Sequence, residues 1–159
     1  MKRAFYFVSI FIMSLLFVFS QAFDLLKVEG KIEPQILSRG QEGKLILNLE
    51  TPEGININLI PSMVIEFKSS QELIFPKGFF TAADLEIEFI EKEGNKYLNL
   101  EKEIEIPFTV SLEAKKGKHK LRGEIKYFAC SVKEGWCLKS STKFSIPFST
   151  RKSIYRKKS

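Results

Sequence analysis

The chain has 159 residues, a formal net charge of +6 and 13% aromatic residues, which fits one domain rather than several. The sequence does not show basic and aromatic residues gathered on one face, so a nucleic-acid partner is not expected. The sequence contains neither a Gly-x-Ser-x-Gly motif nor a phosphate-cradling glycine loop, which argues against the common hydrolase and nucleotide-binding classes.

The N-terminal segment, residues 1–22, has the pattern of a signal peptide. Lys2 and Arg3 precede a mainly apolar run from Ala4 to Phe19, and Ser20-Gln21-Ala22 ends on the small residues that a signal peptidase reads. We expect cleavage after Ala22 and an extracytoplasmic location, in the periplasm or cell envelope. The alternative is an uncleaved segment that tethers the protein to the membrane at its N-terminus.

Residues 23–150 alternate between apolar and polar side chains, the period expected of strands with one face in a core. The expected strands in chain order are 28–32, 45–49, 55–59, 64–67, 74–75, 85–90, 97–100, 103–112, 121–129 and 144–148. Many short strands with turn residues between them favour an all-β, immunoglobulin-like β-sandwich. Pro107 lies inside a strong strand, which predicts an edge position or a bulge there.

The last nine residues, 151–159, form a basic tail with five lysines and arginines and no acid. We interpret it as a solvated tail. Attraction to anionic lipid or to an acidic partner is the alternative.

The two cysteines, Cys130 and Cys137, form the one candidate chemical site. An exported protein enters an oxidising compartment, so a disulfide between them is expected. They lie between two predicted strands, and Gly135 can adopt the turn conformation that brings the strands together. Such a bridge closes a loop of about eight residues and contributes on the order of 2.5 kcal/mol, toward the low end for a structural disulfide.

Aromatic residues flank the cysteines: Tyr127 and Phe128 precede the first, and Trp136 precedes the second. With Lys133, which would favour a thiolate, they fit a thiol–disulfide exchange centre. Aromatic packing on a purely structural disulfide fits the same residues, because immunoglobulin domains show it. The residues alone leave both interpretations open.

A resemblance favours exchange. The run 123–130, which ends in Tyr127-Phe128-Ala129-Cys130, is followed by Trp136-Cys137-Leu138 and by the strand 144–148. This pattern resembles the end of the N-terminal periplasmic domain of the thiol:disulfide interchange protein DsbD family. Residues 54–58 and 75–78 are similar to a strand and a turn of the same domains.

The resemblance implies an immunoglobulin-like carrier that relays reducing equivalents from a membrane electron donor to exported thioredoxin-fold proteins. Cys137 would form the mixed disulfide with a partner, and Cys130 would resolve it. The family also shields its cysteines with an aromatic cap loop, for which Phe79 and Phe80 are the nearest candidates. No cofactor is implied. The competing hypothesis is a non-catalytic envelope binding module with a structural disulfide.

His119, the single histidine, lies in the lysine-rich stretch 115–120, and we expect it to be a solvated turn residue. A metal site from Cys130, Cys137 and His119 would have unusual spacing, so no metal is expected.

Overall fold

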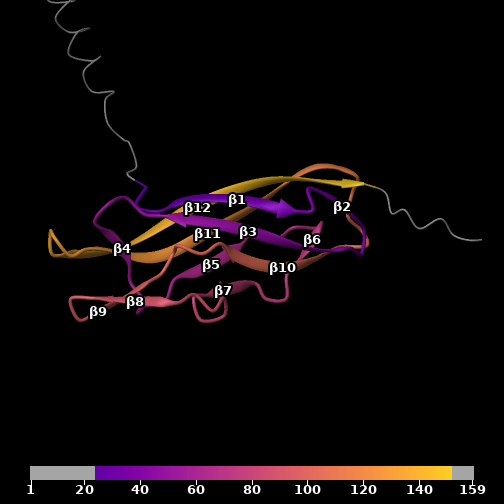
Figure 1. Ribbon diagram of the computed structural model, residues 1–159. Helices are drawn as coiled ribbons and strands as arrows, with labels where there is room; N and C mark the ends of the chain where they lie inside the picture. Colours follow the sequence, from indigo (N-terminus) through magenta and orange to yellow (C-terminus); the bar gives the residue numbers. More distant parts are fainter. Residues whose placement is uncertain (1–23, 152–159) are drawn as a thin grey trace, which may run out of the picture.

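The computed structural model describes residues 24–151 (Figure 1). The predicted signal peptide, residues 1–22, and all of the predicted basic tail except Arg151 lie outside the described residues. Within the described residues no helix is long and apolar enough to cross a membrane.

The regular secondary structure of the described residues consists of β-strands joined by turns and loops. The strands are β1 Lys27–Glu33, β2 Ile36–Ser38, β3 Glu42–Glu50, β4 Ile55–Ile57, β5 Val64–Phe67, β6 Leu73–Ile74, β7 Phe79–Thr81, β8 Phe89–Lys92, β9 Asn95–Leu98, β10 Ile104–Val110, β11 Gly117–Ser131 and β12 Trp136–Arg151.

Two sheets form the two layers of a sandwich (Figure 1). One has the order β1-β3-β10-β6, and the other has the order β2-β12-β11-β5-β7, with β4 pairing the far end of β11. A short third ladder joins β8 to β9. All pairs are antiparallel except β2 with β12. The expected all-β, immunoglobulin-like sandwich is confirmed.

The core between the sheets comes from the period-two pattern. In β10, Ile104, Ile106, Phe108 and Val110 are buried, while the residues between them are exposed. The long strands β11 and β12 alternate in the same way over most of their length. Because alternate side chains of a strand point to opposite faces, each of these strands places one apolar face against the core.

Pro107 occupies an unpaired edge of β10, as predicted. The neighbouring strand β6 pairs only with Thr109 and Val110, so no partner strand needs an N–H group from position 107.

The strand predicted over 85–90 is wrong for its first four residues, because β8 begins only at Phe89. Asp84 is the cause: its Oδ2 accepts hydrogen bonds from the Thr81 backbone N at 2.9 Å and from the Thr81 hydroxyl at 2.8 Å. These bonds close a local turn in which Leu85 N donates to Thr81 O. Local side-chain hydrogen bonding therefore overrides the alternating pattern.

Gly123 provides a direct test of the packing between β11 and β12. A Cβ at this position would lie 2.3 Å from Phe144 Cζ and 2.8 Å from the Glu66 backbone oxygen, and that backbone atom cannot move aside cheaply. We expect Gly123→Ala to lower the free energy of unfolding by about 1–3 kcal/mol, as overpacking does. Chemical denaturation measures the change. Gly78→Ala, where a Cβ would meet nothing within 4 Å, is the control and should fall within about 0.5 kcal/mol of wild type.

Candidate functional site

The cysteines lie at the tip of the hairpin formed by β11 and β12. The two strands pair residue by residue from Gly117 opposite Thr150 to Ser131 opposite Trp136. Residues 132–135 form the connecting turn, in which Gly135 has φ 71° and its N donates to Ser131 O at 2.9 Å. The turn conformation expected of Gly135 is therefore present.

Cys130 and Cys137 face each other directly across this hairpin and form a disulfide. Their sulfurs are 2.05 Å apart and their Cα atoms 4.1 Å apart. The Cα separation is that of a pair whose backbone groups point away from each other, for which about 4.5 Å is typical. The bond from Asn58 N to Phe128 O, at 2.9 Å, agrees with this: it shows that alternate residues of β11 direct their backbone groups toward β4.

The two cysteines differ in exposure. Cys130 is buried, with 2% of its surface exposed, and Cys137 is exposed. A thiolate approaching from solvent therefore reaches Cys137 first, since exchange requires access to the attacked sulfur. The geometry gives the two cysteines unequal positions, with one open to a partner and the other sheltered behind it.

Only one of the three flanking aromatic residues shares a face with the sulfurs. Phe128, two residues before Cys130, points to the same side of the sheet. Tyr127 points into the core, where its hydroxyl lies 3.0 Å from Thr142 Oγ1, and it is 2% exposed. Trp136 also points to the opposite face from its neighbour Cys137 and packs partly against the core. Its Nε1 donates to Glu134 Oε2 at 2.5 Å.

Phe79 and Phe80 lie on β7, and the structure does not bring them to the disulfide. Phe80 pairs with Ile65, which in turn pairs with Ile125, five positions before Cys130 along β11. Phe80 is a core residue that makes an edge-to-face contact with Phe67, and Phe79 is 55% exposed.

The neighbours that sequence reasoning missed come from β4 and β9. Asn56 of β4 pairs with Cys130, and Lys92 Nζ donates to Asn56 Oδ1 at 2.9 Å. Asn58 then pairs with Tyr97 of β9, which is 4% exposed and on the same face as the disulfide. The hairpin of β8 and β9 thus lies beside β4, joined to the segment after it by this single bridge, and its Lys92 contacts the residue paired with Cys130. The sequence signal for this hairpin was the dipeptide Glu93-Gly94. It forms the two-residue turn, and both of its residues have positive φ.

Lysines lie on the sulfur face. Lys139 pairs with Phe128 next to the disulfide, and among residues 24–151 it forms no ion pair. Lys126, further along the same face, donates to Glu66 Oε2 at 2.7 Å, and this hydrogen bond raises the pKa of Lys126. Of these two lysines, only Lys139 has a charge that no carboxylate offsets among residues 24–151, and such a charge favours an anionic group nearby.

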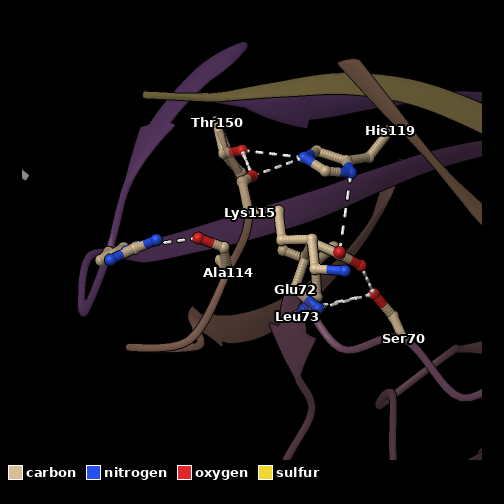
Figure 2. A network of polar contacts seen from close by, with 8 residues as sticks. Ser70, Glu72, Leu73, Ala114, Lys115, His119 and Thr150 are labelled. Atoms are coloured by element: carbon tan, nitrogen blue, oxygen red, sulfur yellow. Dashed lines mark hydrogen bonds and ion pairs between the residues drawn. The ribbon is translucent and has the colours of Figure 1, made fainter. Parts of the chain in front are cut away.

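His119 is not the solvated turn residue that the sequence suggested. It lies in β11, its side chain is only 16% exposed, and its Nε2 donates to Lys115 O at 2.8 Å (Figure 2). Thr150 Oγ1 is also 2.8 Å from Nε2, and Glu72 Oε1 lies 3.7 Å from Nδ1. The reason is the pairing of the start of β11 with the end of β12, which encloses the ring.

This histidine network has no catalytic geometry. Thr150 is 4% exposed and its hydroxyl already donates to Lys115 O, so it is not available as a nucleophile. The network joins the ends of β11 and β12 at the opposite end of the hairpin from the cysteines. Within the described part of the chain, no group of three metal-ligating side chains is present.

No protein-family model matches the chain, and no curated protein sequence matches it. Among solved structures, the N-terminal periplasmic domain of ScsB from Proteus mirabilis is 13% identical with a TM-score of 0.42 over 83% of this chain. The chain spans about half of that structure, 49% of its length. A type I cohesin of ScaB from Pseudobacteroides cellulosolvens is 14% identical with a TM-score of 0.40, over 80% of this chain and 94% of that one.

Murine CRIg is a third similar structure, at 6% identity and a TM-score of 0.32, over 79% of this chain and 98% of that one. At these identities and TM-scores the likenesses assign no function to the chain. The fold assignment therefore rests on the strand order itself.

The unequal exposure of the cysteines predicts unequal labelling. After gentle reduction, we expect a bulky maleimide to modify Cys137 at least about tenfold faster than Cys130, because access to the thiol limits the reaction. Peptide mapping by mass spectrometry at short times measures the two rates. Labelling in denaturant, where the rates should converge, is the control, and equal rates in the folded protein would contradict the exposure difference.

Proposed function

We propose that this chain is an exported thiol–disulfide interchange domain that relays reducing equivalents through Cys130 and Cys137. The observation that carries the proposal is the unequal pair: an exposed residue, Cys137, bonded through its sulfur to a buried residue, Cys130. The resemblance to the DsbD N-terminal domains agrees with this inequality, because it implies that Cys137 forms the mixed disulfide and that Cys130 resolves it. Exported thioredoxin-fold proteins and a membrane electron donor are the proposed partners, in the periplasm or cell envelope.

The exchange needs only sulfur chemistry. A donor thiolate attacks Cys137 Sγ, the bond to Cys130 Sγ breaks, and Cys130 leaves as a thiolate that takes a proton from water. The donor's second thiolate then attacks the mixed disulfide and leaves Cys137 reduced. Reduced Cys137 passes the two electrons on by attacking a partner disulfide, and Cys130 resolves that intermediate and releases the reduced partner. Phe128 and Lys139 flank the attacked sulfur on the same face.

A non-catalytic binding module is the second candidate, and one observation favours it. A groove of about 1110 Å³ lies on the four-stranded sheet, between the outer face of β3 and β10 and the segment 74–76. It is at the other end of the sandwich from the cysteine hairpin, and Ile74 in its wall is 57% exposed. In that function the disulfide would serve only as a staple.

The midpoint potential of the Cys130–Cys137 couple separates the two functions. For an interchange domain we expect a value within roughly −120 to −270 mV, the span of exchange proteins. Equilibration in defined redox buffers, with free thiols counted by mass shift after alkylation, gives the potential. A value below about −300 mV would identify a structural staple and support the binding module.

Trapping tests the order of roles. Cys130→Ser removes the resolving thiol, so the protein should accumulate mixed disulfides with an exported thioredoxin-fold protein through Cys137. Cys137→Ser leaves only the buried thiol and should accumulate at least about tenfold less. Non-reducing electrophoresis of each variant, with and without reductant, measures the adducts. Equal trapping by both variants would contradict the assigned roles.

A further inference from the structure

The strand that carries Cys137 has a free edge. On one side β12 pairs with β11 along its whole length, but on the other side β2 pairs only with Ser149–Arg151. From position 136 to 148, no described residue forms a backbone hydrogen bond with this outer side. β1 of the other sheet packs against part of β12, with Gly30 close to Ile146, but Figure 1 shows the hairpin tip extending past the start of β1. An unpaired strand edge presents donors and acceptors that a further strand can bind.

The backbone of Cys137 itself points out of this edge. In an antiparallel ladder, a pair that exchanges no hydrogen bonds directs its N–H and C=O groups away from each other. Cys130 and Cys137 form such a pair, and Cys130 directs its groups toward β4. Cys137 and, two residues on, Lys139 therefore offer their N–H and C=O groups to an incoming strand.

From this geometry we infer a second class of redox partner, besides the thioredoxin-fold proteins: a protein that adds an extended, cysteine-containing segment antiparallel to the β12 edge, with its cysteine directly opposite Cys137. The inference rests on the proposed function and adds a partner whose cysteine lies in an extended segment rather than at the start of a helix. A hydrogen-bonded antiparallel pair has Cα atoms about 5.5 Å apart, which is within the usual disulfide range. Both side chains of such a pair lie on one face, so docking alone would bring the two sulfurs together.

The charge next to the site specifies one more feature of the partner segment. In the antiparallel arrangement the residue two positions before the partner cysteine lies opposite Lys139 and on the same face. Because Lys139 forms no ion pair among residues 24–151, an acidic residue at that position would complement it. The expected ligand is therefore an extended segment with the pattern acid-x-Cys.

A peptide with a coloured leaving group tests the docking. The probe is acetyl-Thr-Val-Glu-Thr-Cys-Thr-Val-amide with its cysteine linked by a disulfide to thionitrobenzoate, and the protein carries Cys130→Ser. The Cys137 thiolate attacks the peptide sulfur, the bond to thionitrobenzoate breaks, and the released thiolate is followed by absorbance. The symmetrical thionitrobenzoate disulfide, which has no backbone to dock, measures the intrinsic reactivity of Cys137. Each peptide rate is divided by the rate with this small reagent.

A proline at position 139 blocks the edge without removing a bond to β11. The N–H of Lys139 points outward, as the position of native Pro147 does on the same side of β12. Lys139→Ala also removes the charge but keeps the N–H group, so it is the matched control. We expect the normalised peptide rate of Lys139→Pro to be up to about tenfold below that of Lys139→Ala, the upper end of the loss expected for removing one hydrogen bond.

A modified peptide repeats the test without changing the protein. N-methylation of the probe cysteine removes the N–H that would donate to Cys137 O, and it should slow the normalised reaction about tenfold. Replacing the probe's Glu by Lys should slow it further at low salt and less at high salt. Equal normalised rates for the methylated and unmethylated peptides would overturn the docking mode. No reaction of Cys137 with the small reagent would instead overturn the proposed function itself.

Discussion

The register between β11 and β12 is the constraint on which the site depends. A shift of one residue would move one cysteine to the opposite face of the sheet and separate the sulfurs. The register is set far from the cysteines: Phe144 packs over Gly123, the Tyr127 hydroxyl contacts Thr142, and His119 joins the start of β11 to Thr150. Core packing along the hairpin thus determines the geometry at its tip.

The fold could be predicted where one face of a strand is buried, because burial imposes the period-two pattern. This holds for β3, β10, β11 and β12, and for the edge position of Pro107. It failed over residues 85–88, where alternation is present but Asp84 and Thr81 close a turn with their own hydrogen bonds. The pairing of β4 with Cys130, and the bridge between Asn58 and Tyr97 of β9, are non-local and leave no periodic signal in the sequence.

The candidate site was likewise predictable in part. The cysteines and the turn at Gly135 were predictable from their types and spacing, whereas the surroundings were not. Adjacency in sequence suggested that Tyr127 and Trp136 lie beside the sulfurs, but alternation along a strand sends neighbouring side chains to opposite faces. Tyr97, distant in sequence, shares the face of the disulfide instead. Exposure of Cys137 and burial of Cys130 depend on which strands flank the hairpin, and only the structure shows this.

The pairing along the hairpin predicts that the fold survives opening of the disulfide. Its strands are held by fifteen paired positions, and β5 and β4 extend the pairing on one side. The bridge closes a loop of about eight residues and adds only about 2.5 kcal/mol of chain entropy to this scaffold. A staple would contribute most where pairing is absent, but here the disulfide joins residues that are already opposite each other. We therefore expect the ladder to keep Cys130 opposite Cys137 after reduction, which is what the proposed exchange role requires.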